Sequence, residues 1–213
     1  MSERENTGAT PALQSHFYAI VDPIAGHEPV ELARILLESG AKTLQLRLKE
    51  SSARDFLSAA REIVRLCRAA GAAMIVNDRV DIAMLSDADG VHLGQRDIPL
   101  AAGRRLLGRG KIIGISTANV EMAQAAQAGG ADYIGFGPMY PGGLKNITTG
   151  QGLENLRAVR AAVKLPIVAI GGITEGRVRD VLDAGADAAA IITDVVRAPD
   201  IAAKVRSILA ISR

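Results

Sequence analysis

Ile75-Val-Asn-Asp78, followed further on by Val91-His-Leu-Gly-Gln-Arg-Asp97, shows the unit from which this chain is built. Each stretch begins as a short apolar run, typical of a parallel strand buried on both faces, and stops abruptly at polar and acidic residues. Asp78 and Asp97 therefore follow the ends of two successive predicted strands. Ligands of open and closed parallel sheets gather at the carboxyl ends of the strands, so these two side chains are candidate site residues.

The same strand-and-helix unit recurs along the whole chain. The predicted strands are 17–21, 43–47, 72–76, 90–93, 111–115, 133–136, 166–170 and 188–192. The predicted helices are 30–39, 53–70, a short one ending near 85, 99–107, 120–128, 152–163, 175–184 and 198–210. Glycines such as Gly71 and Gly185 end several of these helices, because glycine adopts the left-handed conformation that stops a helix. Side chains expected to cap helix starts are Ser51 or Ser52, Asn119 and Thr174.

Eight such units predict an α/β protein that folds as a single (β/α)8 TIM barrel. We expect residues 1–15 to be a poorly ordered segment and residues 16–213 to form the barrel catalytic domain. A doubly wound open sheet is the structural alternative. Apolar residues make up 48% of the chain but aromatic residues only 3%, and there are 22 glycines. That composition suits aliphatic strands with small residues where helices meet the sheet.

Bulk properties exclude several classes of partner. The net charge is +2 with basic residues scattered among acidic ones, so no nucleic-acid-binding face is expected. No apolar run is long enough to span a bilayer, and no secretory signal precedes the first strand, which predicts a cytoplasmic protein without a membrane partner. Cys67 is the only cysteine and lies on the apolar stripe of a predicted helix, where we interpret it as a core residue. A homodimer is left open.

A cationic face is predicted on the second strand. Gln45, Arg47 and Lys49 alternate, so they share one face that would point into the barrel mouth. Two cations so close together suit a phosphate or diphosphate guest, which arginine binds with two hydrogen bonds. The alternative is that both bases are exposed and pair with Glu50.

Asp78 and Asp97 suit Mg²⁺, which takes few protein carboxylates and completes its shell with water and substrate phosphates. The alternatives are a helix cap for Asp78 and an N-cap before Pro99 for Asp97. His92 lies inside an apolar strand, so it is either a general base or a packed, hydrogen-bonded residue. No serine or cysteine nearby is arranged for nucleophilic catalysis.

A second anion site is expected after the seventh and eighth strands. Gly171-Gly172-Ile-Thr174 opens a predicted helix, and bare glycine backbone lets N–H groups approach an anion. Barrels often bind phosphate from these two loops, and Thr193 adds a hydroxyl from the eighth strand. The alternative is an ordinary tight turn. A metal-linked and a metal-free anion site together favour two phosphorylated small-molecule substrates and a transfer that releases diphosphate.

Seven motifs, in this order, resemble the thiamine phosphate synthase family over most of the chain. They are Gln45-Leu-Arg-Leu-Lys49, Ile75-Val-Asn-Asp78, Val91-His-Leu-Gly-Gln-Arg-Asp97, Gly114-Ile-Ser116, Gly135-Phe-Gly-Pro-Met-Tyr-Pro141, Gln151-Gly-Leu153 and Ile170-Gly-Gly-Ile-Thr174. The Asn-Asp and His-Leu-Gly-Gln-x-Asp pieces are the specific ones. The resemblance implies an enzyme that joins hydroxymethylpyrimidine diphosphate to a thiazole phosphate, giving thiamine phosphate and diphosphate. It also implies ionisation to a pyrimidine carbocation before the thiazole nitrogen attacks.

The resemblance further implies a role for each matching residue. Asp78 and Asp97 would bind Mg²⁺. The diphosphate would be held by Arg47, Lys49, Asn77 and Lys145. The aminopyrimidine ring would contact Gln45 and Ser116, and the thiazole phosphate would contact Gly172 and Thr193. Of these, we expect the catalytic residues to be Arg47, Lys49, Ser116 and Lys145.

One segment departs from the family pattern. After Tyr140-Pro141 the family usually reads Thr-x-Thr-Lys, whereas this chain reads Gly142-Gly-Leu-Lys145 and lacks both hydroxyls. Two alternatives follow from this loss. One is an isomerase that resembles the thiazole tautomerases, some of which have a catalytic histidine where Pro138 stands. The other is a non-catalytic binder of thiamine precursors.

Overall fold

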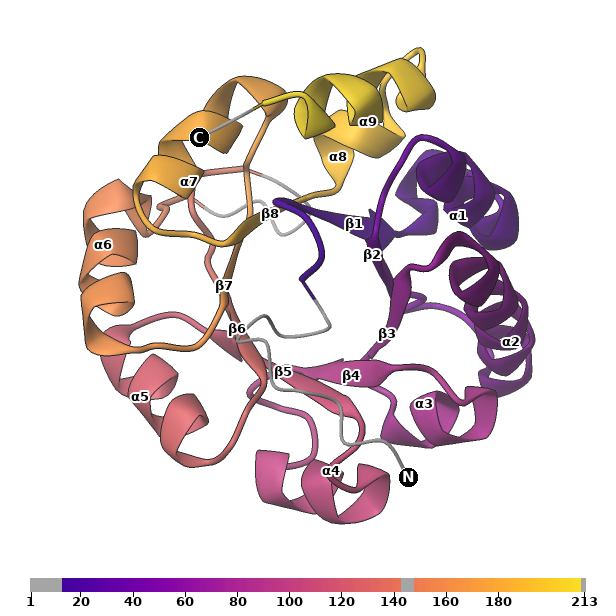
Figure 1. The fold of residues 1–213 in the computed structure, drawn as a ribbon, viewed down its shortest axis with the longest axis horizontal. Coiled ribbons are helices and arrows are strands. Elements are labelled where there is room, and N and C mark those ends of the chain that lie inside the picture. The colour runs from indigo at the N-terminus through magenta and orange to yellow at the C-terminus, as the bar shows by residue number, and fades with distance from the viewer. Residues whose placement is uncertain (1–12, 143–147, 212–213) are drawn as a thin grey trace.

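Eight parallel strands close into a barrel in sequence order, with the helices outside it (Figure 1). The computed structural model describes residues 13–142 and 148–211. Each strand pairs in parallel with the next, and β8 pairs with β1. The strands are β1 (Phe17–Val21), β2 (Thr43–Leu46), β3 (Ala73–Asn77), β4 (Gly90–Leu93), β5 (Ile112–Thr117), β6 (Tyr133–Phe136), β7 (Ile167–Ile170) and β8 (Ala188–Ile191). The predicted (β/α)8 barrel is confirmed and the open sheet is excluded.

Helices follow the strands at the predicted places. They are η1 (Pro23–Ala25), α1 (Pro29–Glu38), α2 (Ala53–Ala70), α3 (Val80–Ser86), α4 (Leu100–Leu107), α5 (Val120–Ala128), α6 (Gly152–Ala162), η2 (Glu175–Arg177), α7 (Val178–Asp183), α8 (Thr193–Val196) and α9 (Ile201–Leu209). Ser52 and Asn119 cap α2 and α5 as predicted. The prediction that Thr174 caps a helix was wrong, because its side chain makes no cap bond and a 3-10 turn begins there instead.

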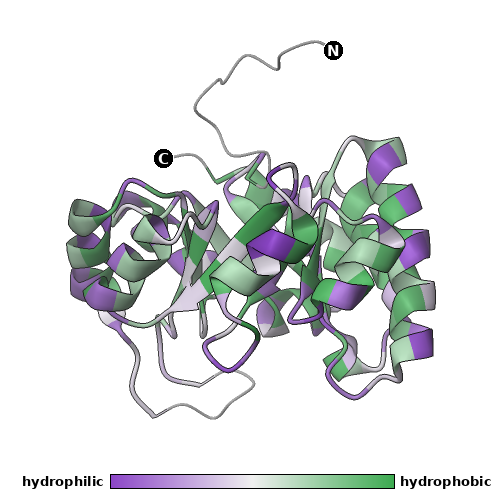
Figure 2. Cartoon of the chain, turned by 90° about the horizontal axis from the view of Figure 1, so that it is seen from below, coloured by the Kyte–Doolittle hydropathy of each residue, from purple (hydrophilic) through white to green (hydrophobic). Residues whose placement is uncertain are grey.

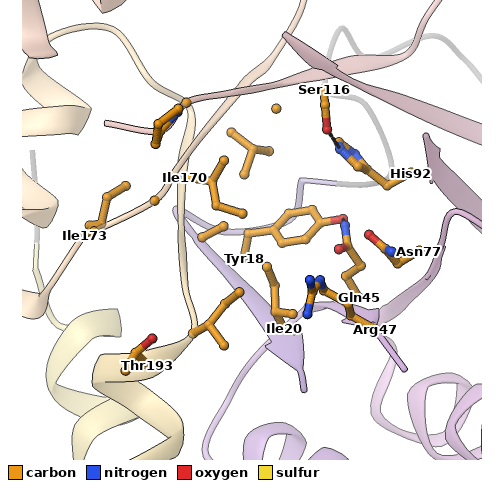
Figure 3. A pocket seen from close by; sticks show the side chains of 18 of the residues that line it. Tyr18, Ile20, Gln45, Arg47, Asn77, His92, Ser116, Ile170, Ile173 and Thr193 are labelled. Atoms are coloured by element: carbon orange, nitrogen blue, oxygen red, sulfur yellow. Dashed lines mark hydrogen bonds between the residues drawn. The ribbon is translucent and has the colours of Figure 1, made fainter. Parts of the chain in front are cut away.

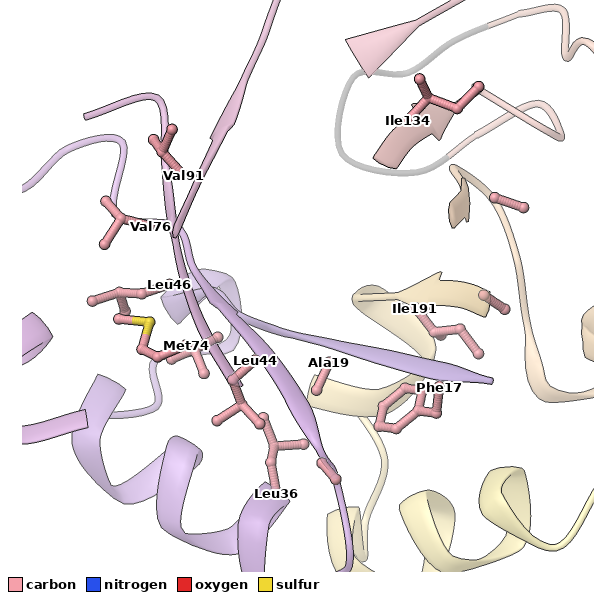
Figure 4. Close-up of a cluster of buried hydrophobic side chains, with 14 of the residues drawn as sticks. Phe17, Ala19, Leu36, Leu44, Leu46, Met74, Val76, Val91, Ile134 and Ile191 are labelled. Carbon is pink, nitrogen blue, oxygen red and sulfur yellow. The ribbon is translucent and has the colours of Figure 1, made fainter. Parts of the chain in front are cut away.

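Side chains alternate along the strands between two separate apolar layers. One layer lies between strands and helices and includes Leu44, Met74 and Val91 (Figure 4). The other fills the barrel interior with residues such as Ile20 and Ile75. The helices turn their hydrophobic residues toward the barrel and many hydrophilic ones outward (Figure 2). This double burial explains why the strands read as continuous apolar runs.

Three aspartates close the amino-terminal end of the barrel in the same way. Each precedes an even-numbered strand and accepts a hydrogen bond from a backbone N–H at the start of the strand before it. The pairs are Asp89 with Met74 N at 2.8 Å, Asp132 with Ile113 N at 2.7 Å, and Asp187 with Ile167 N at 2.8 Å. The bottom of the barrel is therefore fixed by side-chain carboxyl groups, and its open, functional end lies at the opposite edge.

Cys67 is buried on α2, and burial raises the pKa of its thiol to about 12, which confirms a packed core cysteine.

Within residues 13–142 and 148–211, no helix is both long and apolar enough to cross a membrane. The prediction of a poorly ordered segment over residues 1–15 falls largely on residues that the structure does not describe.

Candidate active site

A pocket of about 1240 Å³ opens at the carboxyl ends of the strands. The predicted site residues that line it are Gln45, Arg47, Lys49, Asn77, Asp78, Asp97, Ser116, Gly172 and Thr193. Figure 3 shows Gln45, Arg47 and Asn77 on one wall and Thr193 on another. Lys145 falls outside the described residues, as do positions 143 and 144 of the segment that departs from the family pattern. The barrel thus brings together every predicted site residue that the structure describes.

Asp78 and Asp97 face each other where β3 and β4 end. Asp78 adopts a left-handed backbone with φ of 63° and donates its N–H to the carbonyl oxygen of His92 at 2.8 Å. Asp97 accepts a hydrogen bond from Gly94 N at 2.6 Å. Burial, together with the neighbouring Asp78 carboxylate, raises the pKa of Asp97. Two carboxylates held this close repel each other, so the arrangement favours a cation between them.

Neither aspartate acts as the helix cap that the alternative interpretation required. The N-cap position of α3 is Arg79, which pairs with Asp81, and the N-cap position of α4 is Pro99. Asp97 instead closes a turn within its own loop through Gly94. Both residues line the pocket.

Two carboxylates form a donor set of hard oxygen ligands, which Mg²⁺ accepts. In the part of the chain that the structure describes, no group of three or more His, Cys, Asp or Glu able to hold a metal occurs. An ion held by only two protein ligands takes the rest of its shell from water and substrate phosphates, which is how Mg²⁺ is usually bound.

The two predicted diphosphate-binding cations already hold carboxylate partners. Arg47 forms an ion pair with Asp22, which is 2% exposed at the end of β1, and Lys49 forms one with Asp78. The alternative pairing of both bases with Glu50 was wrong. The repulsion between the guanidinium and the ammonium is offset by these carboxylates, so the cations are held in place before any anion arrives.

A continuous chain of polar side chains crosses the barrel interior and lines the pocket. Gln45 Nε2 donates to the Tyr18 hydroxyl at 3.1 Å, and the hydroxyls of Tyr18 and Tyr133 are 2.8 Å apart. The Tyr133 hydroxyl lies 2.9 Å from His92 Nδ1. His92 Nε2 in turn lies 2.9 Å from Ser116 Oγ (Figure 3). Sequence reasoning missed Tyr18 and Tyr133, although the alternation of β1 places Tyr18 on the inward face with Ile20.

This chain of polar groups decides between the two interpretations of His92. Burial lowers the pKa of His92 from 6.5 to about 4, and the negative charge of Asp78 only partly opposes it. The imidazole is therefore neutral near pH 7, with one nitrogen donating and the other accepting. Both nitrogens are already engaged by the hydroxyls of Tyr133 and Ser116. These contacts match the interpretation of His92 as a packed, hydrogen-bonded residue.

Two glycines make room for the aromatic part of this chain. A Cβ on Gly114 would lie 2.0 Å from the Tyr133 ring, and one on Gly135 would lie 3.0 Å from His92 Cε1. Residue 114 therefore has to lack a side chain for Tyr133 to occupy the barrel interior. The Gly114 motif, which was noted for its resemblance to a family, thus has a steric cause.

The loop after β7 packs tightly against the loop after β6. Gly171 and Gly172 have φ of 98° and 65°, a region that favours glycine. A Cβ on Gly172 would come within 2.8 Å of the Tyr140 carbonyl oxygen, and Tyr140 N donates to Gly171 O at 3.0 Å. Glu175 N donates to Asp194 Oδ2 at 2.9 Å, which joins this loop to α8 beside Thr193. The glycines are thus needed for both conformation and packing, and they still line the pocket.

Fold and site together define a (β/α)8-barrel enzyme whose pocket carries paired charges at the carboxyl ends of its strands. The family model described as thiamine monophosphate synthase matches residues 17–195. The chain belongs to this family, and with it to the transferases of thiamine biosynthesis. The predicted family, fold class and enzyme class are confirmed.

Individual relatives cover nearly all of the chain. A thiamine-phosphate synthase from Methanospirillum hungatei is 48% identical, over 89% of this chain and 93% of its own. One from Moorella thermoacetica is 45% identical, over 89% and 91%. The solved thiamine phosphate pyrophosphorylase from Pyrococcus furiosus is 36% identical with a TM-score of 0.85, over 93% and 95%. A 3-hexulose-6-phosphate synthase, 19% identical with a TM-score of 0.70, shares the fold.

Proposed function

We propose that this chain joins hydroxymethylpyrimidine diphosphate to a thiazole phosphate, with Mg²⁺ as cofactor, and releases thiamine phosphate and diphosphate. The observation that carries the proposal is the placement of Lys49, Asp78 and Asp97 together at one side of the pocket. The glycine loop after β7 lies across the barrel from β3 and β4 (Figure 1). One cavity thus offers two separated regions suited to phosphate groups.

The reaction needs one bond to break and one to form. The bond between the pyrimidine methylene carbon and the diphosphate oxygen breaks, and its electron pair leaves with the diphosphate. The lone pair of the thiazole ring nitrogen then forms the new carbon–nitrogen bond. No step requires a protein side chain to remove a proton from the acceptor nitrogen, which agrees with a neutral His92 whose two nitrogens are already engaged.

Charge stabilisation of the leaving group is the main task of the diphosphate region. Asp78 and Asp97 would hold Mg²⁺, which when bound neutralises charge on the departing diphosphate. Arg47 and Lys49 would bind its oxygens from fixed positions, so little reorganisation accompanies bond breaking. Asn77, which is 9% exposed at the end of β3, would add a hydrogen bond. Lys145 is proposed for the same group from the sequence alone.

The two rings are proposed to bind between these regions. Gln45 and Ser116 end the polar chain that crosses the barrel, and both line the pocket, so they would contact the aminopyrimidine. Gly172 and Thr193 would hold the thiazole phosphate from the loops after β7 and β8. Correct positioning of the acceptor nitrogen would supply much of the remaining rate enhancement.

Purified protein given both substrates and MgCl₂ tests the proposal. We expect diphosphate and thiamine phosphate in equal amounts, quantified by an enzyme-coupled assay and by chromatography. No product at any substrate concentration would rule out the synthase. Conversion of a thiazole carboxylate phosphate in the presence of a chelator would instead identify the isomerase. Tight binding of the substrates in calorimetry without turnover would identify the binder.

We also propose that residues 16–213 are the catalytic domain and that the partners are phosphorylated small molecules. Family membership supports small phosphorylated substrates. Independence from nucleic acid, homodimer formation and cytoplasmic location stay predictions from the sequence.

A further inference from the structure

The pocket carries cations that the roles above do not use. Six cationic side chains of the described residues line it, and three of them have carboxylate partners, namely Arg47, Lys49 and Lys204. The other three, which pair with no carboxylate within residues 13–142 and 148–211, are Arg96, Arg177 and Arg197. An arginine that is fixed but not neutralised is the one best prepared to bind an anion.

Arg177 is fixed without being neutralised. Its Nη1 donates to the Gly172 carbonyl oxygen at 2.8 Å, and its guanidinium carbon lies 4.3 Å from the centre of the Tyr140 ring. Neither contact removes its charge, and most of its N–H donors stay available. The bond also covers a carbonyl oxygen that would otherwise repel an anion at Gly172. Arg96 and Arg197 have no such side-chain contacts among the described residues.

The turn that carries Arg177 is braced from the neighbouring loop and helix. Glu175, two residues earlier, forms an ion pair with Lys204 on α9, whose Nζ lies 2.8 Å from Glu175 Oε2. The backbone N–H of Glu175 donates a hydrogen bond to Asp194 on α8. Arg177 is therefore presented by a segment tied to α8 and α9 rather than by a free loop. Such bracing lowers the entropy that binding would otherwise cost.

We propose that Arg177 binds the phosphate of the thiazole substrate beside Gly172 and so sets the preference for a phosphorylated acceptor over the corresponding alcohol. This inference rests on the proposed function. A phosphate dianion matches an arginine whose charge no carboxylate offsets, and bidentate hydrogen bonds fix its orientation. Tyr140 acts as a positioning residue, since its ring supports the guanidinium plane.

Steady-state kinetics with two acceptors test the assignment. The variant Arg177→Gln keeps a donor for Gly172 but loses the charge. We expect kcat/KM for thiazole phosphate to fall about 10- to 100-fold, the effect of losing a charge-assisted hydrogen bond. For the unphosphorylated thiazole alcohol, kcat/KM should stay within about twofold of the wild-type value. KM for the pyrimidine diphosphate should stay within the same range. Arg177→Lys should recover part of the loss.

Matched controls separate this role from a structural one. Arg179→Gln changes an exposed arginine two positions further on that does not line the pocket, and it should leave both acceptors unaffected. Tyr140→Phe keeps the ring and should preserve the phosphate preference, whereas Tyr140→Ala should lower it. Equal losses for phosphate and alcohol in Arg177→Gln would overturn the proposal, as would no loss for either.

Failure of the synthase reaction would be distinguishable from failure of this inference. If wild-type protein makes no thiamine phosphate, calorimetry with thiazole phosphate and with the alcohol replaces the kinetics. Selective loss of phosphate binding in Arg177→Gln would support Arg177 even then. Unchanged binding of thiazole phosphate to that variant would overturn its assignment.

Discussion

Lys49 and Asp78 form an ion pair between the ends of β2 and β3, at the rim of the pocket. The side chains are 47% and 22% exposed, so solvent screens the pair and it adds little to folding stability. Its importance is electrostatic, because Lys49 occupies one of the carboxylates proposed to bind Mg²⁺. Lysine and metal therefore compete for Asp78 until a diphosphate provides the lysine with another partner.

Lys49→Gln should separate these two effects. Without the ammonium, Asp78 is free and a repelling positive charge is gone, so Mg²⁺ should bind the substrate-free protein more tightly. Turnover should nevertheless fall by about tenfold or more, because the diphosphate loses a charged contact. Calorimetric titration with MgCl₂ and assays of diphosphate release measure both effects. Weaker Mg²⁺ binding in the variant would contradict the competition.

A second lysine serves as the matched control for that experiment. Lys164 is exposed and its side chain has no partner among the described residues. Lys164→Gln should change neither Mg²⁺ affinity nor turnover, which would exclude a general effect of net charge.

Asp97→Asn tests the second carboxylate with almost no change in shape. The amide oxygen can still accept the hydrogen bond from Gly94 N, so the loop should keep its form. Loss of the charge should lower diphosphate release by about 100-fold or more, and excess Mg²⁺ should restore only part of it. Asp81→Asn, on an exposed aspartate paired with Arg79 outside the pocket, is the control. Full activity of the Asp97 variant would remove that residue from the metal site.

Local sequence signals predicted the barrel because each strand-and-helix unit carries the residues that begin and end its helix. Ser52 and Asn119 cap their helices, and Gly71 adopts the left-handed conformation expected of a helix end. The second strand ends with cations and the third with Asp78, so strand order alone places them together. These features depend on neighbours in sequence, which is why sequence reasoning could find them.

The features that were missed depend on contacts between distant strands. Tyr18 and Tyr133 meet across the barrel, and only the closed register brings their hydroxyls together. Arg47 was expected to require an anion, yet Asp22 from the adjacent strand end already supplies one. Thr174 has the residue type of a cap but makes no cap bond, and Asp194 on α8 accepts from Glu175 N at the start of the same turn. Tertiary partners replaced the local ones that the sequence suggested.

The neutral state of His92 should appear in the pH dependence of stability. Its pKa is about 4 in the folded protein against 6.5 unfolded, so between these values the unfolded chain binds more protons. The contribution of neutral His92 to the unfolding free energy is therefore complete above pH 6.5 and is lost as the pH falls toward 4. Facing groups are Tyr133, Ser116 and Asp78, and only Asp78 favours the charged form.

The size of this loss of stability can be checked by urea unfolding at pH 7 and pH 5. From this group alone the unfolding free energy should drop by about 2 kcal/mol over that interval. His92→Asn, which cannot titrate, should show a correspondingly smaller drop. Equal pH dependence in both proteins would show that His92 is not held neutral by the fold.

Asp132→Ala should destabilise the barrel at the end remote from the pocket. The carboxylate accepts from Ile113 N at 2.7 Å and from Arg104 Nη2 at 2.6 Å. Its loss leaves a buried N–H without this acceptor and a half-buried guanidinium without its carboxylate partner, which should cost about 2–4 kcal/mol. Asp183→Ala, on an exposed aspartate, should change stability by no more than about 0.5 kcal/mol. Urea midpoints measure both, and equal midpoints would contradict a role for Asp132 in closing the barrel.

Gly114→Ala should disrupt both stability and turnover, because its new methyl group would lie 2.0 Å from the Tyr133 ring. The ring has to move, and with it the hydroxyl that holds His92, which in turn contacts Ser116. Overpacking of a filled interior costs about 1–3 kcal/mol, and misplacing Ser116 should lower kcat/KM as well. Gly110→Ala, whose Cβ would meet no atom within 4 Å, is the matched control and should leave both unchanged.

In the double variant Gly114→Ala, Tyr133→Leu, stability should recover because the clash is gone, while activity should stay low because the Tyr133 hydroxyl is missing. Recovery of full activity in the double variant would show that Ser116 does not depend on the polar chain for its position.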